Sequence, residues 1–162
     1  MRYLFSIVVA GLLFCTGCSD KSGLFTPDLM EEKALTLTKR GEIYNSLEIK
    51  AALIATYLNP LLKRYRDADR AHFLISLHID NDFTDPKKAG LNNPDYTLTL
   101  NGAAPLAIKP LKEDDPLMKI APVKTLWAHH YLVTFPKHED KALKMVLKSV
   151  RYGSSLLTFR AE

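Results

Sequence analysis

The amino-acid sequence predicts a mainly β protein, a single antiparallel β-sandwich of about seven to eight strands with short helical segments. Two observations carry this prediction. Several stretches alternate apolar and polar residues with a period of two, and clusters of turn-forming residues separate these stretches at the spacing typical of sandwiches. The chain of 162 residues, 47% of them hydrophobic, is long enough to bury one core and shows no internal repeat.

A short helix and a first strand are expected where the domain begins. Thr26-Pro27-Asp28 offers an N-cap hydroxyl, a proline for the first helical position and an early acid. This pattern predicts a helix that ends before Ala34. Alternation begins at Leu35, and Lys39-Arg40-Gly41 can turn the chain before Ile43 resumes the pattern.

The next stretch fits both a strand and a helix. A period-two row predicts a half-buried strand, whereas apolar residues from Ile54 to Tyr65 also recur at helical spacing. Pro60 would remove a hydrogen-bond donor from a continuous helix. We therefore predict a strand to about Leu58, Asn59 as an N-cap and a short helix toward Asp69. The row consists of Leu47, Ile49, Ala51, Leu53, Ala55 and Tyr57.

Further alternating stretches predict the remaining strands. Trp127 heads an inward row with His129 and Tyr131, so both Trp127 and His129 are expected in the interior. Asn101-Gly102 is expected to turn the chain tightly into Leu106 and Ile108. The stretches are residues 72–79, 96–100, 106–108, 127–135, 143–147 and 156–159.

The amino terminus is typical of a secretory signal. Arg2 supplies a positive charge, and an apolar run from Leu4 to Phe14 follows it. This run is too short to span a bilayer, which takes roughly 20 apolar residues.

Cys15-Thr16-Gly17-Cys18 follows the apolar run and resembles the lipobox of bacterial lipoproteins, with Cys15 in the usual place of leucine. In that motif the last cysteine is lipidated and becomes the first residue of the mature chain. The resemblance therefore implies a signal peptide over residues 1–17 and a lipid on Cys18. A signal without a lipid, an uncleaved anchor helix and a redox pair of the two cysteines remain as alternatives, although a redox pair needs a βαβ context.

The lipobox resemblance also implies a location. Ser19 follows the lipidated cysteine at the place where aspartate commonly retains Gram-negative lipoproteins in the inner membrane, so the outer membrane is expected. Residues 18–27 are then the lipidated cysteine and a tether of at most about 30 Å, and residues 28–162 are the sandwich domain. No cysteine follows Cys18, so the domain is expected to fold without a disulfide. The formal charge of +4, without long blocks of like charge, predicts no nucleic-acid partner.

Behind its lipobox, the chain resembles small bacterial lipoproteins that carry an immunoglobulin-like sandwich. The resemblance implies a single immunoglobulin-like domain held to the membrane by the lipid on Cys18. The two cysteines that bracket a tryptophan in antibody domains are not found in this sequence.

No catalytic or metal-binding motif stands out, and neither catalytic residues nor a cofactor are predicted. The histidines His72, His78, His129, His130 and His138 lack the spacing of a zinc site. On strands, His72 and His78 share a face, whereas His129 and His130 point to opposite faces. Asp80 to Pro86 has acids at short spacing, but Asp85 and Leu91 stand where an EF-hand needs glycine and glutamate. A solvated turn is expected there, with loose calcium binding as the alternative.

A row of cations near the carboxyl terminus has two interpretations. On the solvent side of an edge strand, lysines discourage unwanted pairing, and this is the expected role. Contact with anionic lipid headgroups or lipopolysaccharide is the alternative. The row consists of Lys137, Lys141, Lys144, Lys148 and Arg151.

The connection from Asp80 to Asp95 is expected to carry the binding surface, because long loops with ends fixed by strands often serve recognition. Phe83 and Leu91 are its apolar contacts, unless they only pin the loop to the sandwich. We predict a non-enzymatic interaction module for envelope assembly or surface adhesion, with an envelope or host protein as partner. A small envelope hydrolase that uses a metal or a histidine is the alternative. The candidate residues are Asp82, Phe83, Asp85, Lys87, Lys88, Leu91 and Asn92.

Overall fold

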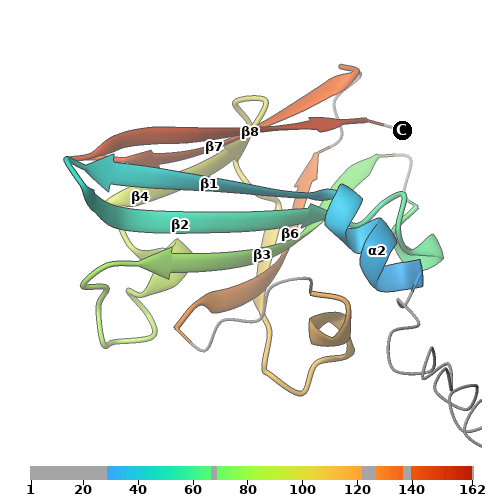
Figure 1. Ribbon diagram of the computed structural model, residues 1–162, viewed down its shortest axis with the longest axis horizontal. Coiled ribbons are helices and arrows are strands. Elements are labelled where there is room, and N and C mark those ends of the chain that lie inside the picture. Colours follow the sequence, from blue (N-terminus) through green and yellow to red (C-terminus); the bar gives the residue numbers. More distant parts are fainter. Residues whose placement is uncertain (1–28, 67–68, 122–126, 137–139, 162) are drawn as a thin grey trace, which may run out of the picture.

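The computed structural model describes residues 29–66, 69–121, 127–136 and 140–161; the lipobox, the tether and the expected helix start at Thr26 lie outside these ranges. Within them the predicted β-sandwich is confirmed, since eight strands form two antiparallel sheets (Figure 1). The strands are β1 (Thr38–Asn45), β2 (Glu48–Tyr57), β3 (Arg70–Ile79), β4 (Tyr96–Leu100), β5 (Ala107–Pro110), β6 (His129–Pro136), β7 (Ala142–Ser149) and β8 (Gly153–Arg160). The described helical segments are α2 (Leu29–Thr36) and the 3₁₀ turns η2 (Lys63–Tyr65), η3 (Gly90–Asn92) and η4 (Pro116–Lys119).

The order of the strands follows a known pattern. The larger sheet has the order β1-β2-β3-β6-β5, and the smaller sheet has the order β4-β7-β8. With β1 set aside, these orders correspond to A-B-E-D and C-F-G of a constant-type immunoglobulin sandwich. β1 is an additional strand that pairs with β2, the counterpart of strand A, and so extends the larger sheet at that edge.

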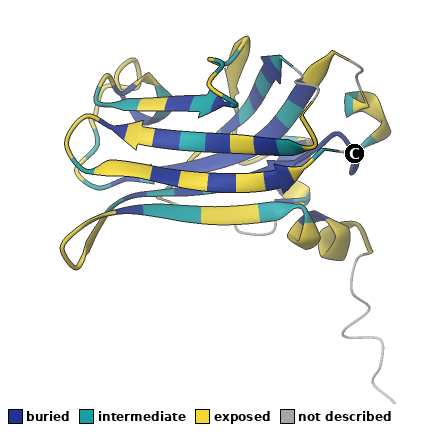
Figure 2. Cartoon of the chain, turned by 90° about the horizontal axis from the view of Figure 1, so that it is seen from above, coloured by how far each residue is buried: buried dark blue, intermediate teal, exposed yellow. Residues whose placement is uncertain are grey.

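The core lies between the two sheets, and buried and exposed residues alternate along the strands (Figure 2). Phe73 has no exposed surface and lies among three other rings, those of Tyr57, Phe135 and Phe159. The centroid distances are 5.0 Å, 6.0 Å and 5.1 Å, within the range at which aromatic pairs attract. All buried residues of the two hydrophobic clusters lie between Ala34 and Phe159. The chain after Cys18 therefore contains every buried residue of these two clusters.

A second cluster covers one end of the outer face of the larger sheet. Leu74 points away from the main core, yet it is only 2% exposed. It packs with Ala34 of α2 and with Leu117 and Met118 of η4. The half of this outer face nearer the β1–β2 turn has no such cover among the described residues (Figure 1).

β1 and β8, which lie at the edges of the two sheets, approach each other closely at Gly41. A Cβ atom at Gly41 would lie 2.2 Å from Ser155 Oγ and 2.8 Å from Leu157 Cδ2. The missing side chain of glycine permits this approach. It brings the sheets together along this side.

The predictions for the first helix and strand are wrong in detail. The helix continues past Ala34 to Thr36, and Lys39-Arg40-Gly41 lies inside β1 instead of forming a turn. β1 pairs with β2 along its whole length. These pairings override the local turn propensity of the three residues. The chain turns instead at Ser46, which has a φ of 56°.

The helix expected after Asn59 is reduced to the 3₁₀ turn η2. Asn59 does not act as an N-cap. Its side chain donates to the carbonyl of Arg70 and accepts from the backbone N–H of His72, both at 2.7 Å. These bonds hold the connection to the start of β3, so the chain returns to the sheet after one short turn.

The turn at Asn101-Gly102 forms as predicted, with φ values of 47° and 83°. The strand after it does not pair with β4, however, because β5 joins β6 in the other sheet. The Asn101 side chain accepts from the backbone N–H of Lys144 at 2.6 Å. The turn is therefore tied to β7 rather than being the tip of a free hairpin.

The interior positions predicted for Trp127 and His129 are wrong. Trp127 is 78% exposed, and the His129 side chain is 49% exposed. β6 begins only at His129, so the alternation of the strand does not reach Trp127. The rest of that row, from Tyr131 to Phe135, is buried on every second residue, as predicted.

The expected role of the lysines in shielding an edge is also wrong. Lys144 and Lys148 point to solvent from β7, but β7 is the central strand of the smaller sheet. Both of its edges are already paired, with β4 and with β8. Lys137 lies outside the described residues.

Candidate functional site

An exposed apolar and aromatic surface occupies the uncovered half of the outer face of the larger sheet. Trp127, Tyr44 and Ile49 are 78%, 51% and 40% exposed. Contiguous apolar patches of this kind often mark interaction sites, whereas single exposed apolar residues are ordinary. We call this surface the tryptophan face and define it as Arg40, Tyr44, Ile49, Ala52, Ile54, His78 and Trp127.

Strand pairing places these side chains next to one another. Arg40 lies opposite Ile54 across the β1–β2 pair, and Tyr44 lies opposite Ile49. In the β2–β3 pair, Ala52 lies opposite His78. A groove of about 260 Å³ is lined by residues of these rows and by Trp127. Because strand pairing sets the positions of all of these residues except Trp127, which precedes β6, most of the surface is preformed.

Polar contacts hold the edge of the tryptophan face in place. The Tyr44 hydroxyl donates to the Glu42 carboxylate, and the Arg40 guanidinium pairs with the same group. The hydrogen bond from Tyr44, and then the charge and hydrogen bond of Arg40, lower the pKa of Glu42. At the other side of the groove, His78 Nδ1 lies 3.0 Å from the carbonyl oxygen of Trp127. Trp, Tyr and Arg are the residue types most enriched at protein-binding hot spots.

The loop predicted to bind a partner is organised by Asp82. One oxygen of its carboxylate accepts from the backbone N–H of Phe83 at 2.8 Å and from the Asn93 side chain at 2.9 Å. The other accepts from the backbone N–H of Gly90 at 2.6 Å. A carboxylate used in this way shapes the loop. The role of Asp82 is therefore to hold the loop in shape through hydrogen bonds within the loop.

Leu91 is likewise used by the fold. It packs against the main core, and its N–H donates to the Tyr131 hydroxyl at 3.3 Å. Asp85 accepts from the backbone N–H of Lys87 at 2.9 Å, and Lys50 pairs with Asp80 at 2.9 Å. The interpretation that Leu91 pins the loop to the sandwich agrees with these contacts.

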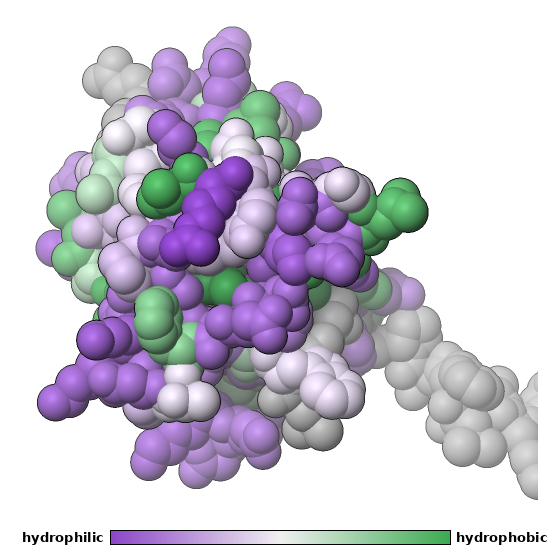
Figure 3. All heavy atoms as spheres, turned by 90° about the vertical axis from the view of Figure 1, so that its left-hand side faces the viewer, coloured by the Kyte–Doolittle hydropathy of each residue, from purple (hydrophilic) through white to green (hydrophobic). Residues whose placement is uncertain are grey.

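Other candidate residues of the loop point to solvent. Phe83 is 46% exposed, and Lys87, Lys88 and Asn92 are exposed as well. The end of the sandwich that this loop shares with the β1–β2 turn is mostly hydrophilic, with hydrophobic residues scattered over it (Figure 3). Recognition through this loop stays a prediction.

His72, His78, His129 and His130 lie on the sheet faces as predicted, and His138 lies outside the described residues. His72 and His78 share the outer face of β3 with Ser76, and Ser76 Oγ lies 2.8 Å from His130 Nδ1. Ser76 is only 5% exposed, which leaves little of its hydroxyl accessible to a substrate. Within the described ranges, no group of three or more His, Cys, Asp or Glu side chains is placed to hold a metal ion.

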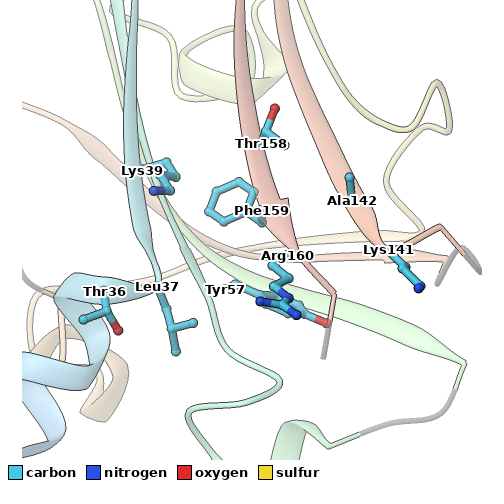
Figure 4. A pocket seen from close by; sticks show the side chains of 9 residues that line it. All are labelled: Thr36, Leu37, Lys39, Tyr57, Lys141, Ala142, Thr158, Phe159 and Arg160. Carbon is cyan, nitrogen blue, oxygen red and sulfur yellow. The ribbon is translucent and has the colours of Figure 1, made fainter.

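A second concave site opens where β1 and β8 separate, at the end of the sandwich that carries α2 and the C-terminus (Figures 1 and 4). This cleft has a volume of about 410 Å³. Tyr57 and Phe159, which are 1% and 4% exposed, form its apolar floor together with Leu37. Exposed cations stand around it: Lys39, Lys141 and Arg160.

Comparison with known proteins identifies no relative: no family model, no curated protein and no solved structure matches the chain. None of the helices in the described ranges has the length and apolarity needed to cross a membrane.

The tryptophan face was not predicted from the sequence, although one signal of it is present there. β2 is apolar on both faces, since Ala52 and Ile54 point outward where Ala51 and Leu53 point inward. A strand with one solvated face normally alternates apolar and polar residues. Apolar residues at both odd and even positions of a strand thus indicate that its outer face is also covered, either by an element such as α2 or by a partner.

Proposed function

We propose that the protein is a lipid-anchored lipoprotein of the outer membrane that acts as a non-enzymatic interaction module. Its partner is an envelope protein that docks on the tryptophan face. One observation carries the docking proposal: Trp127 is 78% exposed beside other exposed apolar side chains on a rigid sheet. The anchor follows from the resemblance of residues 15–18 to a lipobox.

The composition of the tryptophan face favours a protein partner. Burying Trp127, Tyr44 and Ile49 in an interface removes a large apolar area from water at little cost in side-chain freedom. Arg40 and the ionised Glu42 supply polar groups at the margin of this area. An apolar centre with a polar rim is the usual anatomy of a protein interface.

Crosslinking in intact cells tests the docking site. We expect a photo-crosslinking residue at Ile49 to form one discrete protein adduct, and the same residue at exposed Leu156, on the smaller sheet, to form none. Trp127→Ala should weaken the adduct from position 49, because truncation of a hot spot costs about 2 kcal/mol, or roughly thirty-fold in affinity. The adducts are quantified by immunoblotting and identified by mass spectrometry.

The same experiment can reject the site. Equal adducts from positions 49 and 156, or an adduct that does not respond to Trp127→Ala, would exclude the tryptophan face as the docking surface. A crosslinker at Phe83 tests the earlier prediction for the loop. A strong adduct from Phe83, with none from Ile49, would place recognition on the loop.

The anchor has its own test. Cys18→Ser should abolish incorporation of labelled fatty acid and release the domain from the membrane fraction, because the thiol that accepts the lipid is gone. Cys15→Leu is the matched control, and it should keep the label, since Cys15 belongs to the discarded signal. Undiminished labelling of Cys18→Ser would disprove lipidation at this residue.

A further inference from the structure

We propose that the end of the sandwich next to the tether docks on an anionic lipid surface, with the cleft between β1 and β8 receiving lipid headgroups. We call it the tether end. It comprises residues 29–39, 57–66, 69–72, 140–142 and 158–161. This inference goes beyond the proposed interaction module, because it concerns a second surface and a different kind of partner.

The charge of the cleft carries the first step. Lys39, Lys141 and Arg160 are exposed around it, and no acidic side chain is among its lining residues. None of the three forms an ion pair with another described residue. Positive charges around a cleft with an apolar floor concentrate a positive electrostatic potential at its opening. Lysine and arginine are also the side chains that bind phosphate groups.

Among the described residues around the cleft, basic side chains also outnumber acidic ones. The described residues of the tether end include eight basic and four acidic side chains, a formal excess of four positive charges. Three of the basic residues, Lys63, Arg64 and Arg66, follow one another closely at η2 and are exposed. Clusters of basic residues next to a membrane anchor are attracted to anionic lipids.

The tether end also presents apolar groups suited to a lipid interface. On α2, Leu29, Leu35 and Met30 are 80%, 54% and 38% exposed. The rings of Tyr57 and Phe159 form the floor of the cleft between the surrounding strands (Figure 4), but they are buried, so the side chains of α2 supply the exposed apolar surface. Apolar side chains flanked by cations bind membrane surfaces by burial and by charge together.

The path of the chain brings this end toward the bilayer. α2 begins directly after the tether, and the C-terminus lies at the same end (Figure 1). If Cys18 carries the lipid, the residues between it and Leu29 reach at most roughly 40 Å. The tryptophan face lies on the larger sheet nearer the β1–β2 turn, so docking of the tether end leaves it accessible.

Vesicle binding of the chain from Ser19 onward tests this proposal without the lipid anchor. This chain contains both hydrophobic clusters in full. We expect it to cosediment with vesicles of phosphatidylcholine and phosphatidylglycerol, to be released by salt and not to bind phosphatidylcholine alone. Replacing Lys39, Lys141 and Arg160 with glutamine should lower binding about a hundred-fold, given the usual contribution of each cation near an anionic surface.

A matched control removes the same charge elsewhere. Lys87, Lys88 and Lys148 lie away from the tether end, and their replacement with glutamine should change binding by no more than a few-fold. Circular dichroism verifies that both triple variants are folded.

Three results would overturn the proposal. They are failure to bind the anionic vesicles, an equal loss in both triple variants, and release by inorganic phosphate beyond that by another salt of equal ionic strength. The last would indicate a free-phosphate site. Trp127→Ala should leave vesicle binding unchanged, and the protein used in this assay, which begins at Ser19, lacks Cys18. Failure here is therefore distinguishable from failure of the proposed interaction module.

Discussion

Phe73→Ala is expected to lower the free energy of unfolding by about 3–5 kcal/mol, the usual cost of truncating a fully buried aromatic residue. Phe73 has no exposed surface and contacts rings from β2, β6 and β8. The substitution leaves a cavity between the two sheets, where neither sheet can close it alone. A loss of this size is a large part of the stability of a domain of this length. Urea unfolding followed by far-ultraviolet circular dichroism measures it.

Trp127→Ala is the matched control for this experiment. It removes a larger aromatic side chain, but from a position that is 78% exposed. We expect a change of no more than about 1 kcal/mol, as for other surface substitutions. A loss comparable to that of Phe73→Ala would show that Trp127 is part of the core and would remove the main support for the tryptophan face.

The fold class was predictable because apolar and polar residues alternate so regularly along the strands. Phe73, Ile75 and Leu77 on β3, like Tyr131, Val133 and Phe135 on β6, meet in the core at every second residue. An apolar period of two is typical of a strand and does not fit a helix. Pairing between strands was not predictable in the same way. Asn101-Gly102 predicted a turn correctly, but whether β5 would join β4 or β6 depends on contacts distant in the sequence.

The candidate surfaces could not be predicted from the sequence, and the reason is physical. Periodicity gives the face on which a residue lies only while the strand lasts, and β6 begins after Trp127. The cleft was missed because it joins Lys39, Lys141 and Arg160 from three separate segments. The loop after β3 was correctly singled out as long, but Asp82 satisfies its backbone internally. An acidic residue that shapes a loop and one that binds a partner have the same appearance in a sequence.

Gly90→Ala is expected to cost about 2–5 kcal/mol, because it combines two independent penalties. Gly90 has a φ of 61°, a conformation that costs an L-residue roughly 1–2 kcal/mol. A Cβ atom there would also lie 2.0 Å from the Tyr131 hydroxyl and 3.1 Å from its Cζ atom. Tyr131 is only 5% exposed, so its ring has little room to move, and movement breaks the hydrogen bond from Leu91. A buried hydrogen bond lost in this way costs about 1–3 kcal/mol.

Gly102→Ala separates the two penalties, since Gly102 has a φ of 83° and nothing within 4 Å of the added Cβ. It should cost only the conformational part, about 1–2 kcal/mol. Tyr131→Phe provides a second check, because it removes the atom closest to the new Cβ. In the Gly90→Ala background it should be less destabilising than in the native chain, a non-additivity that a double-mutant cycle of urea midpoints measures. Equal losses for the two glycines, together with additive behaviour of Tyr131→Phe, would mean that the loop moves away from Tyr131 freely. The loop would then not be fixed to the sandwich in the way that its contacts indicate.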